Sequence, residues 1–125
     1  GPGYGAAMKR TDDDNDAPLS AVMGPGAHYE GDLSFEGRVR VDGHFTGRIY
    51  SEDLLELGVQ GTIEGEADVA RAIIAGRVIG RLRVRERLVV DSTGSIEGKL
   101  DAGLCELRTG ARISGEVLIR GEEVP

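Results

Sequence analysis

Six glycines recur at near-even intervals along this chain, and their spacing constrains the fold more than any other feature. They lie 15 to 18 residues apart, each in the frame apolar-x-Gly-x-apolar: Gly31, Gly47, Gly65, Gly80, Gly98 and Gly115. A fixed period of this length is typical of solenoids, in which each repeat buries its apolar face only by stacking on its neighbours. Because solenoids work by presenting surfaces, we expect a structural or binding protein before an enzyme with a pocket.

Apolar and polar residues alternate between these glycines, and a period of two indicates β-strands rather than helices. Each coil carries three short inward-facing apolar segments, so equivalent positions of stacked coils form ladders. One ladder contains the residues two places before each glycine: Tyr29, Phe45, Ile63, Val78, Ile96 and Ile113. We therefore predict an all-β chain with a single parallel β-helix of about six coils and a triangular cross-section. The periodicity leaves its handedness open.

The differences in coil length are concentrated at one point of the repeat. A second inward pair precedes each later glycine by ten and eight residues in the longer coils, as with Leu55 and Leu57. In the two shortest coils it precedes the glycine by eight and six residues, as with Val39 and Val41. We therefore predict one corner that is two residues shorter in these coils. The recurring glycines are expected at another corner, where glycine supplies positive φ.

The outward-facing charges agree with the register that the apolar residues define. Arg83 falls between Asp68 and Asp101, and Arg81 falls beside Glu66. Opposite charges across neighbouring strands are favourable, whereas like charges are not. One pair of like charges on neighbouring strands, Arg81 and Lys99, goes against this pattern.

Composition divides the chain into four parts. Residues 1–7 resemble the scar of a cleaved expression tag, and Met8 resembles a natural start. Residues 8–26 contain a run of aspartates with too little apolar surface to fold, so we predict a disordered acidic tail. Residues 27–120 form the predicted β-helix domain, and residues 121–125 form a polar stub.

Charge and reactive side chains argue against nucleic-acid binding and catalysis. The chain has 22 acidic and 15 basic residues, and a net charge of −7 opposes binding to nucleic acid. Neither His28 nor His44 belongs to a catalytic or metal-binding motif, and Cys105 falls at an inward position typical of a small core residue. We predict no catalytic residue, metal or cofactor. Without an apolar run of about 20 residues or a secretory signal after Met8, we expect a cytoplasmic protein.

The most conspicuous charged run consists of Arg81, Arg83, Arg85 and Arg87. One interpretation is a surface that binds an acidic partner, which would make the protein a monomeric binding module. The other is a solvated strand face that is neutralised by acidic neighbours, since isolated surface ion pairs contribute little. A left-handed β-helix acyltransferase is a further alternative, although the six-residue repeat of that family is not sustained here.

The two terminal coils are where function is expected. A β-helix leaves strand edges unpaired only there, and neither end of this sequence predicts a capping helix. The predicted polymer interface comprises the apolar residues of these coils: Tyr29, Leu33 and Phe35 in the N-terminal coil, and Ile113, Val117, Leu118 and Ile119 in the C-terminal coil. Uncapped ends predict end-to-end association into open filaments. The alternative is that the acidic tail folds over the N-terminal end as a cap.

Across about residues 24–120, the sequence resembles the bactofilins, which are polymer-forming bacterial cytoskeletal proteins. The resemblance rests on five segments: residues 22–26 (VMGPG), 30–33 (EGDL), 39–43 (VRVDG), 45–49 (FTGRI) and 61–65 (GTIEG). The Val41-Asp42-Gly43 segment followed by x-x-x-Gly47 is the most characteristic.

This resemblance implies a right-handed β-helix and nucleotide-independent, non-polar filaments built from head-to-head and tail-to-tail contacts. It also implies a scaffold that positions cell-wall enzymes, shape-determining machinery or chromosome-segregation proteins, with the flexible tail contributing to partner choice. In some members a short apolar N-terminal motif binds the inner face of the membrane. The corresponding residues here are Leu19, Val22 and Met23, beside an acidic run that disfavours anionic lipid.

Overall fold

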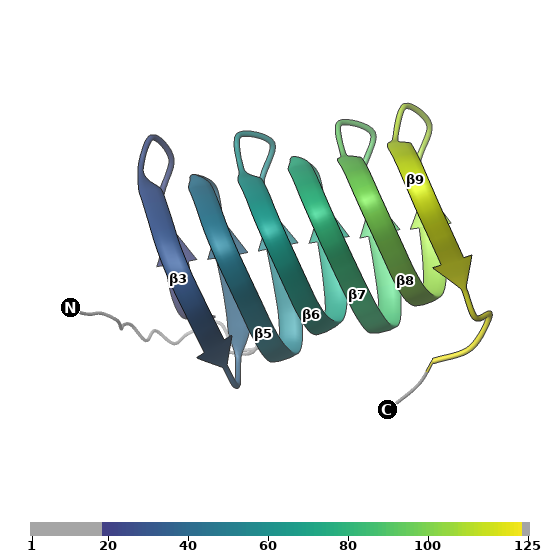
Figure 1. The fold of residues 1–125 in the computed structure, drawn as a ribbon, viewed down its shortest axis with the longest axis horizontal. Coiled ribbons are helices and arrows are strands. Elements are labelled where there is room, and N and C mark those ends of the chain that lie inside the picture. The colour runs from purple at the N-terminus through teal and green to yellow at the C-terminus, as the bar shows by residue number, and fades with distance from the viewer. Residues whose placement is uncertain (1–18, 124–125) are drawn as a thin grey trace.

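The computed structural model describes residues 19–123, which form one parallel β-solenoid (Figure 1). Its strands follow one another along the chain: β2 (Leu19–Met23), β3 (His28–Phe35), β4 (Arg38–Val41), β5 (His44–Leu57), β6 (Thr62–Ile74), β7 (Arg77–Val90), β8 (Ser95–Leu107) and β9 (Arg112–Ile119). All the described strand pairs are parallel. Within this part of the chain, no helix is long and apolar enough to cross a membrane.

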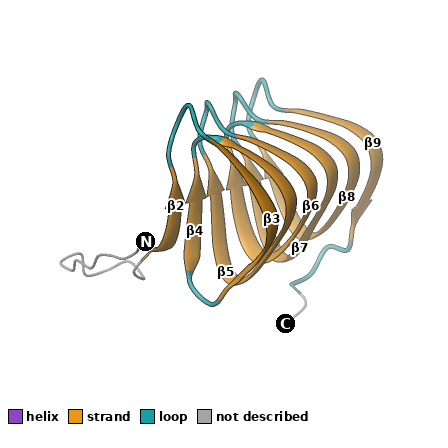
Figure 2. Ribbon diagram, turned by 60° about the vertical axis from the view of Figure 1, so that its left-hand side comes forward, coloured by secondary structure: helices purple, strands orange, loops and turns teal. Residues whose placement is uncertain are grey.

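Each long strand bends partway along its length, so that β5, β6, β7 and β8 each form the front and rear segments of one coil (Figures 1 and 2). The strands β3 and β4 together form the first coil, and β9 forms the front segment of the last. The predicted parallel β-solenoid of about six turns is therefore confirmed. Its right-handedness and triangular cross-section stay predictions.

The strand register is the one that the glycine spacing predicts. The six glycines are in-register partners from β3 through to β9, and the ladder from Tyr29 to Ile113 lies beside them. However, the glycines lie within the strands rather than at a loop corner, with φ between 122° and 137°. This φ range is one that L-residues rarely adopt, which explains why glycine recurs there.

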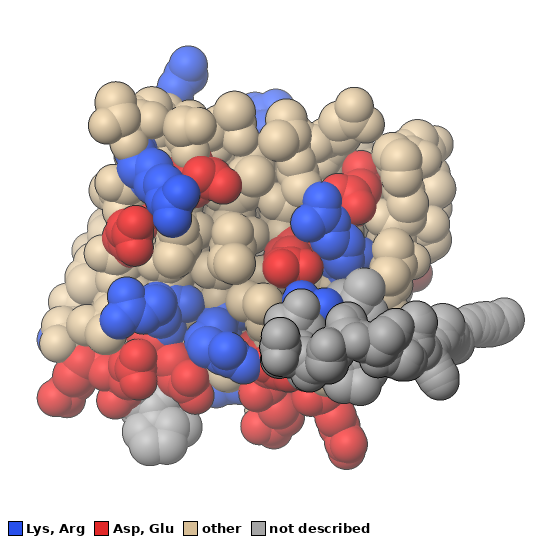
Figure 3. Space-filling view, turned by 180° about the vertical axis from the view of Figure 1, so that it is seen from behind, with Lys and Arg blue, Asp and Glu red and all other residues tan. Residues whose placement is uncertain are grey.

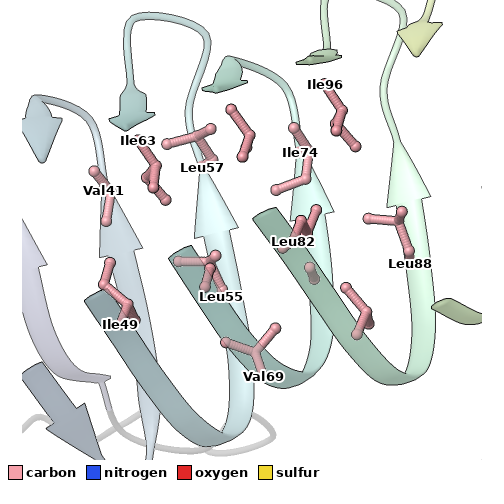
Figure 4. Packing of buried hydrophobic residues seen from close by; sticks show 14 of the residues in the cluster. Val41, Ile49, Leu55, Leu57, Ile63, Val69, Ile74, Leu82, Leu88 and Ile96 are labelled. Atoms are coloured by element: carbon pink, nitrogen blue, oxygen red, sulfur yellow. The ribbon is translucent and has the colours of Figure 1, made fainter. Parts of the chain in front are cut away.

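Stacked apolar side chains fill the interior between the front and rear segments (Figure 4). Phe45, Leu82 and Leu88 are fully buried, and they come from the different inward segments of the coils. Ser51 is a buried polar exception within an otherwise apolar ladder. Its hydroxyl donates to the carbonyl oxygen of Gly37 at 2.8 Å and accepts from the Asp53 amide at 3.0 Å. The buried Ser51 hydroxyl therefore has both an acceptor and a donor as hydrogen-bond partners.

Two sets of corners account for the variation in coil length. At one corner, the connections in the two shortest coils contain two residues, 42–43 and 75–76, whereas residues 58–61, 91–94 and 108–111 form four-residue connections. This confirms the predicted shorter corner. The remaining variation lies at the bend between front and rear segments, where the register shifts between Ser51 and Leu54 and at the equivalent points of later strands.

Residues 19–23 form β2, which corrects the predicted extent of the disordered tail. Met23 is only 5% exposed and is the register partner of Val41, whereas the preceding residue, Val22, is 58% exposed. The carbonyl oxygen of Met23 also accepts a hydrogen bond from the Asp42 amide at 2.7 Å. Burial of Met23 and pairing with β4 thus order this segment, although the acidic run before it favours disorder. The predicted segment 1–7 and residues 8–18 of the predicted tail lie outside the described residues.

Candidate assembly surfaces

At the C-terminal end, apolar side chains are exposed at ladder positions that are buried in the inner coils. Among the strands of residues 19–123, β9 pairs with β8 alone. Val117 is 51% exposed and Ile119 is 40% exposed, although their register partners Leu100 and Ala102 are buried. The edge of β9 therefore combines unpaired backbone groups with a half-covered apolar row, which is the combination that favours pairing with another chain.

Leu107 belongs to the same end but was not among the predicted interface residues. It is 55% exposed, whereas its register partner Val90 is fully buried. The rear segment of β8 has no described strand beyond it, because β9 ends at Ile119. The sequence signal was present, since Leu107 occupies an inward ladder position, but the end of the last coil was not located from the sequence.

The other two predicted C-terminal residues occupy different surroundings. Ile113 is half-buried against the core. Leu118 is the register partner of Asp101, an outward position, and is 56% exposed on the front face. The structure thus places Val117 and Ile119 on the uncovered end, with the partly buried Ile113 on the same strand, and places Leu118 on the side of the solenoid.

The N-terminal end is better covered than the C-terminal end. Tyr29, Leu33 and Phe35 are half-buried and pack against the core. Of the strands that the structure describes, only β5 pairs with β3. The Tyr29 hydroxyl accepts a hydrogen bond from the Gly24 amide at 3.3 Å. Behind β3, the short strand β2 adds a rear segment beside β4. The three predicted residues therefore share one end, where β3 and β2 present the strand edges.

The arginine run does not form one surface. Arg81 and Arg83 flank Leu82 on the front segment of β7, whereas Arg87 precedes Leu88 on its rear segment (Figure 4). Arg85 lies at the bend between these segments. Its guanidinium donates to Asp68 and, at 3.0 Å, to the Ser51 carbonyl oxygen, and it lies 5.2 Å from the centroid of the Tyr50 ring. The Arg85 side chain is therefore held by contacts within its own chain.

Figure 3 shows two separate groups of charged side chains on the upper part of the rear face, with uncharged surface between them, and a band of charges along its lower edge. On β4 the Arg40 guanidinium makes two hydrogen bonds of 3.0 Å to the Asp42 carboxylate, and this hydrogen bonding raises the pKa of Arg40. At the corner after β8, Arg108 lies 3.3 Å from Glu106 and 3.7 Å from Asp91. These charges are matched locally, which is expected for a solvated face.

His28, His44 and Cys105 make contacts that fit a structural role. The rings of His28 and His44 stack with centroids 4.5 Å apart, and His44 is within 2.8 Å of Glu64. Within residues 19–123, no group of three or more His, Cys, Asp or Glu side chains is arranged to hold a metal ion. Cys105 packs against the core as the register partner of Leu88, and burial raises the pKa of its thiol.

The chain matches one family model, described as "Bactofilin: Polymer-forming cytoskeletal", over residues 21–118. The match starts within β2 and ends within β9, so it extends over every coil described above. Comparisons with curated proteins and with solved structures found no match.

Proposed function

The chain belongs to the bactofilin family of polymer-forming cytoskeletal proteins, and from this we propose that it assembles end to end through its two terminal coils. As a member of this family it is a structural protein rather than an enzyme. The observation that carries the proposed interface is the uncovered edge of β9, where Val117 and Ile119 are half-exposed at positions that the inner coils bury.

Apolar burial and strand pairing both favour this contact. Covering a half-exposed valine, leucine or isoleucine contributes about 1 kcal/mol, half of the value for complete burial. Three such side chains, Leu107, Val117 and Ile119, lie at the C-terminal end. Pairing of the β9 edge would also satisfy backbone groups that otherwise face solvent. None of these contributions requires a nucleotide, so filaments should form without one.

We infer that the filament is non-polar, with like ends in contact, as the family resemblance implies. A two-fold contact places the same patch of both subunits together, so each apolar row covers its own equivalent. Head-to-tail assembly would instead join β9 to the β3 edge of the next subunit, and the two arrangements give different products when one end is blocked.

The test introduces a charge at each end separately, with Phe35→Arg at the N-terminal coil and Ile119→Arg at the C-terminal coil. Burying an unpaired charge in the contact costs several kcal/mol, so both variants should lose filaments in electron microscopy. In a non-polar assembly each variant still forms dimers through its intact end. In a head-to-tail assembly each variant is monomeric, and dimers appear only when the two are mixed.

A matched control is Val59→Arg, which adds the same charge at a corner residue that is 67% exposed. This variant should form filaments like the unmodified chain. Unchanged filaments in both end variants would overturn the interface assignment, and an unmodified chain that stays monomeric at all concentrations would overturn the assembly itself.

We further infer that the filaments lie in the cytoplasm and act as a scaffold for protein partners in cell-wall growth, cell shape or chromosome segregation. Residues 8–18 precede β2 and thus join the solenoid at its N-terminal end. Comparing client capture by the chain with and without these residues tests their role. Met23 is a core residue, whereas Val22 is 58% exposed, so of these two only Val22 is available for membrane contact. Flotation of the Val22→Asp variant with anionic vesicles tests this contact.

The monomeric alternative with an arginine-rich binding face loses its main support, because the four arginines divide between two segments and a bend. The acyltransferase alternative is not retained, because the family is structural.

A further inference from the structure

Four outward charges alternate in sign across the N-terminal part of the front face. Beyond them the same row continues with Lys99 on β8 and Glu116 on β9, and Lys99 repeats the positive charge of its register partner on β7. Asp32, Arg48, Glu66 and Arg81 follow the recurring glycines of β3, β5, β6 and β7 and are register partners from strand to strand. Each is exposed and points away from the core. Neighbouring strands lie about 4.8 Å apart, so these four charges extend along the axis for roughly 14 Å with the sequence minus, plus, minus, plus.

An alternating row of four charges is complementary to its own reverse. When two copies of this face meet with their solenoid axes antiparallel, Asp32 of one copy faces Arg81 of the other, and Arg48 faces Glu66. Each of these contacts occurs twice, because the two-fold axis passes between β5 and β6. If the solenoid axes are instead parallel and each strand faces the same strand of the other copy, every charge faces a like charge, which is unfavourable.

The next outward row is compatible with the antiparallel arrangement. It contains Ser34, Tyr50, Asp68 and Arg83 on the same strands. In the antiparallel pair Ser34 faces Arg83, and Tyr50 faces Asp68, so no like charges meet. The Ser34 hydroxyl can accept a hydrogen bond from Arg83, whereas the Tyr50 hydroxyl already donates to Glu52 at 2.8 Å.

The surface is hollowed where this contact would form. A shallow hollow of about 380 Å³ is lined by residues of both rows on β3, β5 and β6: Asp32, Ser34, Arg48, Tyr50, Glu66 and Asp68. Three of its lining side chains are carboxylates and one is an arginine. Arg81 and Arg83 of a second copy would face the β3 side of this hollow, which offers them acidic neighbours and room for long side chains.

From these observations we propose that the front face of β3, β5, β6 and β7 binds the same face of a second copy, with the two solenoids side by side and antiparallel. This contact is distinct from end-to-end assembly and would join filaments laterally. The contact is mainly between exposed charges, so it is weak and sensitive to salt, with a Debye length of about 10 Å at 0.1 M.

Charge reversal at Asp32 and Arg81 tests the proposal, because the two residues are three coils apart in one chain and meet only across the pair. Arg81→Glu and Asp32→Arg should each abolish the pairing of filaments that electron microscopy shows at low salt. The double variant Asp32→Arg/Arg81→Glu restores both opposite-charge contacts and should restore pairing. Preformed filaments of the two single variants should also pair with each other when mixed.

The matched control is Arg87→Glu, on the rear segment of the same strand, which should leave pairing unchanged. Circular dichroism melting checks that each variant is folded. The proposal is overturned if the unmodified filaments do not pair at low salt, if either single variant pairs normally, or if the double variant does not recover. If the chain forms no filaments at all, sedimentation at low salt applies the same criteria to side-by-side dimers, so the failure of end-to-end assembly is distinguished from failure of this contact.

Discussion

Gly47 and Gly65 are in-register partners on β5 and β6, and a Cβ atom on Gly65 would overlap the carbonyl oxygen of Gly47. The same relationship repeats along the glycine column as far as Gly115, always with positive φ. Two independent constraints, the backbone conformation and the close approach of the next coil, therefore exclude side chains at these positions.

The two constraints can be separated by comparing Gly65→Ala with Gly31→Ala. Gly31 has a similar positive φ of 137°, but an added Cβ would meet no atom within 4 Å. Gly65→Ala should lower the free energy of unfolding by about 3 kcal/mol or more, since strain and overlap with backbone combine. Gly31→Ala should cost about 1 kcal/mol, from strain alone. Urea denaturation at one protein concentration measures both, and equal losses would show that overlap contributes nothing.

Arg85 should contribute more to stability than any other member of the arginine run. Its side chain is 15% exposed and it bridges Asp68 to the Ser51 carbonyl oxygen. Arg85→Ala leaves these acceptors without their donor, which costs about 1–3 kcal/mol. The matched change Arg87→Ala removes an exposed arginine of the same strand and should stay within about 0.5 kcal/mol of the unmodified chain. Thermal melting of the two variants checks this order, and similar melting temperatures would contradict it.

Two neighbouring residues of β2 should differ in how much their truncation lowers stability. Met23→Ala removes a buried side chain that packs against the first coils, and we expect a loss of about 2 kcal/mol. Val22→Ala trims an exposed side chain and should change stability by less than about 0.5 kcal/mol. Chemical denaturation measures both losses. If Met23→Ala is as stable as the unmodified chain, β2 does not belong to the folded core.

Cys105 should report on the coverage of the C-terminal end. Burial raises the pKa of its thiol, so at pH 8 less of it is thiolate, the reactive form, than in a free cysteine. Alkylation by iodoacetamide should therefore be slower than for a free cysteine, and its rate should still rise with pH above the usual thiol pKa. Filament formation should slow it further, whereas Ile119→Arg should not show that second protection. Equal rates in filaments and in Ile119→Arg would argue that the C-terminal coil stays uncovered.

The regular part of the fold could be predicted from the sequence because it repeats. Every coil places apolar residues at the same offsets from a glycine, so Phe45, Ile63 and Val78 could be aligned without coordinates, and the structure pairs them as aligned. The shorter corners were predictable for the same reason. The charge register of Arg81 beside Glu66 followed from the same alignment.

The irregular parts could not be predicted in this way. A strand such as β2 occurs once, and its five residues were outweighed by the acidic run before them. The bend between front and rear segments contains one or two residues in different coils, so the sequence could not show that Arg83 and Arg87 lie on separate segments. Leu107 belongs to a ladder, but its exposure depends on where the last strand ends.

By itself, the sequence determined the solenoid, its register and the residues of its core, because these depend on local periodicity and on backbone constraints that repeat from coil to coil. Only the tertiary structure decided which apolar positions remain uncovered and which charged residues share one segment of a coil. Those properties depend on which strands have a neighbour and on where each coil bends, and neither is encoded in the period of the repeat.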